Sequence, residues 1–463
     1  MARTYGAASS DRDDGIGEHD NAPLLGNAPP KTVEAEQEDG HATIASCVMA
    51  SGGIIPGALT CITSGCIGAL GLWMLSRCAT RTPHRRSSFF AVSKITFPSA
   101  AVFFDAAIAI KCFGVSISYL IIIKGLMPKV VHSFYHVFTA PDVNPPWWAV
   151  SGHVWIFIFL AFLAPLCFLH RLDSLRHTSY VALFSVFYLV GVVIVCYFFP
   201  PKGIMERGEV HLVHIDKSFI STFPVQVFAF TCAQNLFPLY NELRSNTQAR
   251  MNLVIFSSIF SAAATYEVIA LFGYLTFGSK VGPNIIAMYP PTTLFIAIGQ
   301  FAIVVMVMFS YPLQVHPCRG CLDKVFHGGH KPVAPAAQGA DADDDEDEVL
   351  AEALDPHGAH GQMTMARHIA LTVGIVGCGF AIAYFVDDLQ LVLSFVGSTG
   401  STTISFILPG LFYFKLFRND PGHSRVLLGA ALALALYGAL IFVFCLTFNI
   451  LKVVDAHRLA RGG

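Results

Sequence analysis

Charged residues are scarce in this chain of 463 residues. Asp, Glu, Lys and Arg make up 13% of it, whereas hydrophobic residues make up 54%. Soluble domains carry roughly 25% charged residues, so a deficit of this size argues against a soluble protein. An excess of basic charge is also lacking, because 29 Lys and Arg nearly balance 31 Asp and Glu. Nucleic-acid-binding domains usually have a basic patch or a pI above about 9, and we therefore predict no nucleic-acid partner.

Two signatures of secreted proteins are missing as well. The 12 Cys fall mostly within apolar stretches, where Cys behaves as a small hydrophobic residue, and their spacing suggests no disulfide framework. Residues 1–40 are polar, contain Gly and Pro and are rich in acidic residues. This composition is unlike a cleavable signal peptide and is typical of a disordered N-terminal tail.

Long apolar segments are what the sequence has in abundance. A helix needs about 20 apolar residues to cross the hydrocarbon core of a bilayer, whereas barrel strands are about 10 residues long and alternate in polarity. The sequence therefore predicts an all-α polytopic membrane protein with about ten spans in the lipid bilayer. These spans lie near 52–76, 97–123, 147–169, 179–199, 219–238, 251–277, 292–316, 366–386, 389–414 and 426–451.

The connecting segments indicate an orientation. Loops that follow the odd-numbered spans hold sixteen Lys and Arg, and the loops between them hold six. Because cytosolic loops are enriched in Lys and Arg, the first set is expected to be cytosolic. It includes the one long hydrophilic insertion, 317–365, whose acidic run 343–348 is typical of a solvated loop. The transmembrane regions are thus 41–316 and 366–451, followed by a C-terminal tail, 452–463.

Three charged residues lie well inside predicted spans, away from the span ends, where charge is costly and usually functional. Lys111 and Asp105 are about 1.7 helical turns apart and should point to different faces. Glu267 lies near the middle of the sixth span. We consider Glu267, Asp105 and Lys111 as candidates for coupling to protons, with Glu267 or Asp105 as the proton-binding carboxylate. The alternatives are a structural ion pair between Lys111 and Glu267, or side chains that face water.

The fifth span carries polar residues near its end. Thr231, Gln234 and Asn235 lie close to Pro238, which lacks a backbone donor and weakens a helix. A helix broken at membrane depth is tolerated where it lines an enclosed cavity, and its freed ends can bind substrate. The alternative is a helix that ends at the membrane interface near Asn235.

The ninth span contains the run Gly-Ser-Thr-Gly-Ser-Thr-Thr over 397–403. Ser398 and Thr399 are candidates for an ion path, although small hydroxylated residues also permit close helix packing. His132 and His136 have the spacing of a metal-binding pair on a helix, but the other His pairs fall in different loops. The sequence therefore predicts no metal site, no cofactor and no enzymatic activity.

Four stretches together resemble the amino acid/auxin permease family, and within it the fungal vacuolar amino-acid transporters. They are 105–128 (DAAIAIKCFGVSISYLIIIKGLMP), 223–243 (FPVQVFAFTCAQNLFPLYNEL), 251–278 (ending ALFGYLTFG) and 397–416. The resemblance implies eleven spans, of which the first ten form a LeuT-type inverted-repeat helical bundle. It also implies secondary active, proton-coupled transport of amino acids at the vacuolar membrane, with the plasma membrane as the alternative location.

The resemblance places the substrate between two broken helices at equivalent positions in the two repeats. The second broken helix corresponds to 219–238, so Phe228, Phe230, Thr231, Gln234 and Asn235 become the candidate substrate-binding residues. A membrane amino-acid sensor or an inactive paralogue remains the alternative to a transporter.

The sequence departs from the family at its first span. The family's first broken helix carries a Gly-containing motif of the form I-G-x-G-x-L-x-x-P, whereas here 41–48 runs directly into 49–57 without it. Only 35 residues separate Ala42 from Ser76, and two spans with a turn need about 40 or more. We therefore expect one span to be missing, through either a wrongly predicted exon or a degenerate copy.

Overall fold

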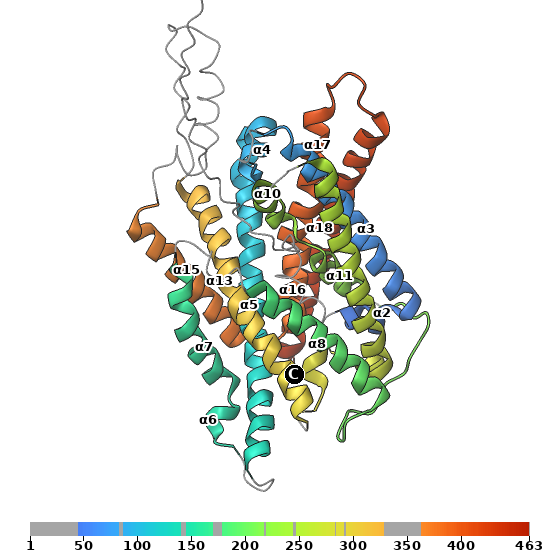
Figure 1. The fold of residues 1–463 in the computed structure, drawn as a ribbon, viewed down its shortest axis with the longest axis vertical. Coiled ribbons are helices and arrows are strands. Elements are labelled where there is room, and N and C mark those ends of the chain that lie inside the picture. The colour runs from blue at the N-terminus through green and yellow to red at the C-terminus, as the bar shows by residue number, and fades with distance from the viewer. Residues whose placement is uncertain are drawn as a thin grey trace, which may run out of the picture.

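A computed structural model describes residues 45–82, 87–139, 145–169, 178–216, 219–243, 247–282, 284–290, 293–327 and 363–462. Every regular element within these ranges is helical, which confirms the predicted all-α class (Figure 1). The expected N-terminal tail over 1–40 and the acidic run 343–348 lie outside the described residues.

The helices are numbered as in Figure 1. They are α2 (Ala45–Gly52), α3 (Ile54–Ala79), α4 (Phe89–Thr96), η1 (Pro98–Ala100), α5 (Ala101–Phe138), α6 (Trp147–Val150), α7 (Gly152–Cys167), α8 (Thr178–Phe198), α9 (Phe219–Ala229), α10 (Ala233–Glu242), α11 (Gln248–Phe277), η3 (Gly278–Lys280), α12 (Ile285–Met288), α13 (Leu294–His327), α15 (Met365–Phe385), α16 (Leu389–Val396), η4 (Gly397–Ser401), η5 (Thr403–Ile407), α17 (Leu408–Phe417) and α18 (Arg425–Gly462).

The chain is a multi-pass membrane protein. In its described part, eight helical stretches are long and apolar enough to cross a membrane, and α16, η4, η5 and α17 together make one of them. The shorter apolar helix α7 and the pair formed by α9 and α10 occupy the segments where the sequence predicts two further crossings.

Three helices, α5, α13 and α18, run further than the sequence analysis expects, and α5 continues past 123 to Phe138. Helix α13 continues through Pro317 to His327, into the segment expected to be loop. Arg319 in this extension has buried partners, because its Nη1 donates to the carbonyl oxygen of Cys167 (2.7 Å) and to Thr372 Oγ1 (3.0 Å). Helix α18 likewise continues through the expected tail to Gly462, since no proline interrupts it.

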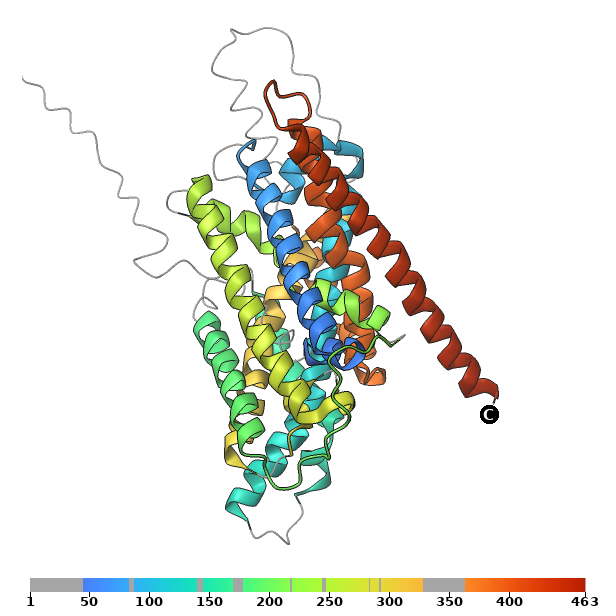
Figure 2. The same cartoon turned by 90° about the vertical axis from the view of Figure 1, so that its right-hand side faces the viewer.

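Helix α5 is the central column of the molecule. It packs against α13 along much of its length and also contacts α7, α15 and α16. In Figure 1, α5 extends from the end of the molecule where α4 lies towards the end where α6 lies. Helix α18 lies at the outer edge of the bundle (Figure 2). Helix α5 therefore packs against helices from both the N-terminal and the C-terminal parts of the chain.

Helix α2 precedes the first full span, and its described residues are Ala45–Gly52. Gly53 follows with a φ of 85°, a left-handed conformation that glycine adopts readily. Met49 of α2 lies against Gly57 of α3, which shows a sharp turn between the two helices. Helix α2 is mostly buried and contacts α3, α9 and α11.

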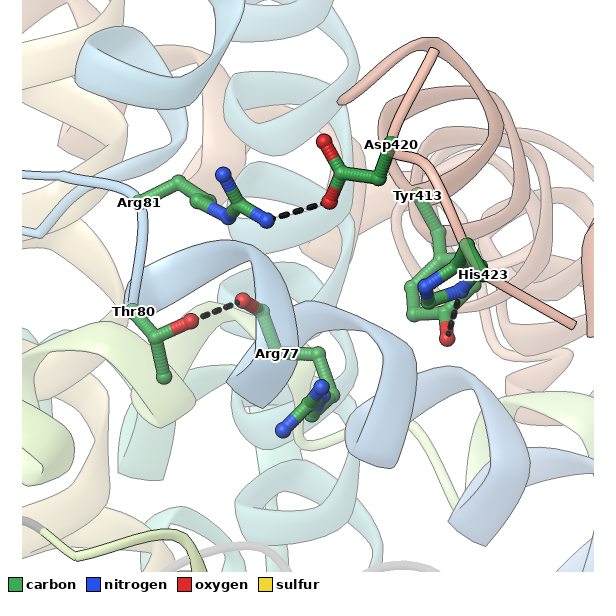
Figure 3. A network of polar contacts seen from close by, with 6 residues as sticks. All are labelled: Arg77, Thr80, Arg81, Tyr413, Asp420 and His423. Carbon is green, nitrogen blue, oxygen red and sulfur yellow. Dashed lines mark hydrogen bonds and ion pairs between the residues drawn. The ribbon is translucent and has the colours of Figure 1, made fainter. Parts of the chain in front are cut away.

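Polar contacts fasten α3 to the turn between α17 and α18 (Figure 3). Arg81, just after α3, forms an ion pair with Asp420 of that turn, and its guanidinium lies 4.9 Å from the centre of the Phe417 ring. Tyr413 Oη and His423 Nε2 form a hydrogen bond of 3.0 Å. The C-terminal end of α3 is thereby held against the C-terminal third of the chain.

Candidate functional site

The fifth predicted span is interrupted in its middle. Helix α9 ends at Ala229 and α10 begins at Ala233, with Phe230, Thr231 and Cys232 between them. Other groups replace the lost helical hydrogen bonds: Thr231 Oγ1 donates to the Val227 carbonyl oxygen (2.9 Å), and Tyr266 Oη of α11 donates to the Ala229 carbonyl oxygen (3.2 Å). Of the two alternatives that the sequence left open, the structure therefore shows the broken helix. Asn235 lies inside α10 and not at a helix end.

Small residues on α3 make room for this interruption. A Cβ atom added at Gly65 would lie 3.4 Å from the Phe230 ring, and one added at Gly68 would lie 3.5 Å from Phe230 Cβ. On its other side the Phe230 ring meets the Tyr266 ring edge to face, with ring centres 5.3 Å apart. Phe230 is thus enclosed between α3 and α11, and Phe228 is fully buried.

A second irregular helix packs against the first. Between α16 and α17 the backbone adopts the π-helical segments η4 and η5, which are rare and occur frequently at functional sites. Thr402 Oγ1 donates to the Gly397 carbonyl oxygen five residues earlier (2.6 Å). Ser398 and Thr399 lie in η4, and their hydroxyls donate to the Phe395 carbonyl oxygen at 3.2 and 2.7 Å.

The two irregular helices touch at two points. Ser405 Oγ of η5 donates to Thr231 Oγ1 over 3.3 Å, and both side chains are buried. Gly397 lies so close to α9 that an added Cβ atom would be 2.1 Å from the Pro224 carbonyl oxygen. The break in one helix therefore lies against the π-helical turns of the other.

Lys111 of α5 belongs to the same region. Its side chain is fully buried, and within the described residues its Nζ has no hydrogen-bond partner. An added Cβ atom at Gly400 would lie 2.7 Å from Lys111 Cβ, so η4 packs directly on this lysine. The electrostatic neighbours of its ammonium group include Cys232, at the break between α9 and α10.

Gln234 and Asn235 follow the break. Asn235 donates its backbone N–H to the Cys232 carbonyl oxygen (3.0 Å), which begins α10. The side chain of Gln234 is half-buried, and among the described residues neither of its amide atoms has a hydrogen-bond partner.

Glu267 does not pair with Lys111. It lies on α11 and its carboxylate interacts with the thiol of Cys61 on α3. Its Oε1 is buried and lacks a hydrogen-bond partner in the described part of the chain. Glu267 remains a carboxylate inside a span, next to Tyr266, whose hydroxyl holds the end of α9.

Asp105 lies apart from these groups. It is buried on α5 and interacts with Cys321 and Lys324 of α13. Its partners therefore differ from those of Lys111, in agreement with the prediction that the two side chains point to different faces of α5. Both partners lie on α13 and not on the broken helix.

His132 and His136 lie side by side on α5, with their Nε2 atoms 3.3 Å apart. In the described part of the chain, no group of three or more His, Cys, Asp or Glu residues is arranged to hold a metal ion.

The sequence analysis did not foresee the contacts of three residues at the two irregular helices: Tyr266, Ser405 and Gly400. Each is an ordinary residue within an apolar segment, and its role depends on a neighbour distant in the sequence. Only the adjacency of Tyr266 to Glu267 on a membrane helix could have drawn attention to it.

Comparison with known proteins places the chain in a family. Residues 45–451 match the family described as "Transmembrane amino acid transporter protein". The chain belongs to this family. The matched region includes all the described residues of α2.

Three relatives illustrate the range of similarity. The chain is 39% identical to vacuolar amino acid transporter 5 of Schizosaccharomyces pombe, over 87% of this chain and 88% of the relative. It is 34% identical to vacuolar amino acid transporter 6 of Saccharomyces cerevisiae, over 85% and 92%. A more distant relative is sodium-coupled neutral amino acid symporter 2 of Danio rerio, at 25% identity over 71% and 63%.

Proposed function

We propose that this protein moves amino acids across the vacuolar membrane by secondary active transport coupled to protons. Family membership and the names of the two fungal relatives support the substrate class and the membrane. The observation that carries the proposal is the contact between the broken helix and the π-helical turns, through Thr231 and Ser405. Irregular backbone at membrane depth is costly unless it lines a protein-enclosed site.

The proposed substrate site is formed by the residues around the break. Thr231, Gln234 and Asn235 offer polar groups to the charged ends of an amino acid, while Phe228 and Phe230 form the apolar wall. Ser398 and Thr399 lie on the facing helix, where they contribute to an ion path. Transporters with inverted repeats bind their substrates at such discontinuous helices near the bilayer midplane.

We propose Glu267 as the proton-binding group. A carboxylate within a membrane is a recurrent element of proton relays, and Glu267 lies on α11 beside the residue that holds the end of α9. Protonation there can therefore change the packing at the break.

We further propose the topology that the charge distribution favours. The end of the bundle that carries α4 and the Arg81–Asp420 ion pair would face the cytosol, together with the insertion between α13 and α15. The long helices α5 and α13 would occupy equivalent positions in two inverted repeats, in keeping with their extensive contact.

The test is uptake of radiolabelled L-amino acids into vesicles that contain the purified chain, with and without a proton gradient. We expect saturable uptake of at least one amino acid, and we expect the gradient to drive accumulation. Saturable binding without any flux would instead support an amino-acid sensor.

A further inference from the structure

Lys111 poses a physical problem within the proposed function. A buried ammonium group is strongly unfavourable unless an anion or hydrogen-bond acceptors surround it. Within the described residues its Nζ donates to no acceptor. Both carboxylates that the sequence places within spans have other neighbours: Asp105 interacts with Lys324 and Cys321, and Glu267 with Cys61.

Another buried lysine on the same helix provides a comparison, because its ammonium group has hydrogen-bond acceptors. Lys124 is also buried, but its Nζ donates to the carbonyl oxygens of Ala383 (3.0 Å) and Tyr384 (2.9 Å). It also forms an ion pair with Asp387 Oδ1 (2.7 Å). These acceptors lie at and just beyond the C-terminal end of α15, a place that favours a cation. Lys124 is therefore fully satisfied by the protein, whereas Lys111 is not.

The surroundings of Lys111 indicate where its missing partner would lie. Gly400 lies against its backbone and Cβ, so η4 covers one side of the lysine. Its ammonium group has Cys232, at the break of the other irregular helix, as an electrostatic neighbour. Two more side chains have buried polar atoms without hydrogen-bond partners in the described chain and lie close in sequence to these contacts: Ser401 follows Gly400, and Gln234 lies two residues after Cys232.

We propose that Lys111 is the residue that binds the α-carboxylate of the transported amino acid. A carboxylate supplies both the negative charge and the acceptor oxygens that the ammonium group lacks. Gln234, whose Oε1 has no hydrogen-bond partner among the described residues, then serves as an acceptor for the α-ammonium group. This inference rests on the proposed function and adds a substrate requirement: a free α-carboxylate is essential, whatever the side chain.

The test is equilibrium binding to the purified full-length protein in lipid nanodiscs. The probes are the radiolabelled L-amino acid that the wild-type protein binds most tightly and its unlabelled carboxamide, in which a neutral amide replaces the carboxylate. We expect the carboxamide to compete at least tenfold more weakly in the wild-type protein. Lys111→Met should weaken binding of the amino acid at least tenfold, because a hydrogen bond to a charged group is lost, and leave the affinity for the carboxamide within about threefold.

Lys124→Met is the matched control, since it removes a buried lysine from the same helix, and it should keep the wild-type preference for the carboxylate. If Lys111→Met does not fold, the comparison of the two ligands in the wild-type protein still tests whether binding requires a free α-carboxylate. Equal affinity for amino acid and carboxamide in the wild-type protein, or an unchanged preference in Lys111→Met, would overturn the role of Lys111 while leaving the proposed function intact. A wild-type protein that binds no amino acid would overturn both.

Discussion

Thr231 links the two irregular helices through a chain of hydroxyl groups. Ser405 Oγ donates to Thr231 Oγ1, which in turn donates to the Val227 carbonyl oxygen. The Thr231 hydroxyl therefore replaces a helical bond that the break removes, and it joins α9 to η5. A residue with these two contacts can transmit a change at the substrate site from one helix to the other.

Replacing these polar groups should remove transport while leaving the protein folded. For Thr231→Val and Asn235→Leu we expect the affinity for the transported amino acid to fall at least tenfold, because a contact to a charged ligand is worth about 1.5–3 kcal/mol. Uptake into vesicles at several substrate concentrations measures this. Thr63→Val is the control, since the Thr63 hydroxyl is exposed and bonds only to carbonyl oxygens of its own helix. Wild-type uptake curves for both site variants would show that these residues only shape the backbone.

Glu267 is the residue whose substitution separates binding from coupling. In Glu267→Gln the side chain keeps its size but can no longer take up and release a proton. We expect substrate binding to persist and accumulation driven by a proton gradient to disappear, with downhill exchange of amino acid retained. Glu209→Gln, which changes an exposed carboxylate, should behave as the wild-type protein. Undiminished gradient-driven uptake by Glu267→Gln would assign coupling to another group.

At the scale of single elements, the close approach of η4 to α5 depends on the absence of a side chain at position 400. A Cβ atom there would lie 2.6 Å from the Ala107 carbonyl oxygen and 2.9 Å from the Lys111 backbone nitrogen. These are backbone atoms, which cannot move aside without shifting a helix. Glycine at this position thus allows the π-helical turns to pack on α5.

Gly400→Ala should therefore destabilise the protein and disturb substrate binding together. Overpacking of a well-packed interior costs about 1–3 kcal/mol, and we expect a lower midpoint of thermal unfolding together with weaker amino-acid binding. Gly377→Ala is the matched control on α15, where an added Cβ atom would meet nothing within 4 Å. If both variants unfold at the same temperature, the packing of η4 on α5 is looser than this geometry requires.

The irregular helices differ in how well they can be predicted from the sequence. Polar residues in an apolar span indicated the interruption near Thr231, although the break lies at residues 230–232 and Pro238 falls inside α10. The run over 397–403 was equally compatible with ordinary close packing. Its π-helical form accompanies contacts of Gly397 with α9 and of Gly400 with α5, and such contacts between distant segments leave no local pattern. The same holds for Glu267, whose neighbour Cys61 could not be chosen from the sequence.

At the scale of the whole molecule, the segment before α3 sets this chain apart from the family pattern that the sequence resembles. Helix α2 is mostly buried against α3, α9 and α11. The lengths of the apolar segments predicted about ten spans, and eight helical stretches of the described chain are long and apolar enough to cross a membrane. The burial of α2 could not be predicted, because it depends on contacts with segments distant in the sequence.

Restoring a complete first span should therefore raise both abundance and activity. An inverted-repeat carrier builds its site from two broken helices near the bilayer midplane, so loss of the first would remove half of the site. We would insert a family-type first span between Val48 and Met49 and compare it with the 463-residue chain in the same vesicles. We expect at least tenfold faster amino-acid uptake per molecule, and an N-terminus moved to the cytosolic side because one crossing has been added. Insertion of an apolar helix of equal length without the Gly-containing motif separates the change in topology from the change in transport: it should move the N-terminus and leave uptake at the level of the 463-residue chain. Equal uptake by all three chains would mean that α2, Gly53 and α3 already form a complete first element, and that the family's extra span is dispensable for transport.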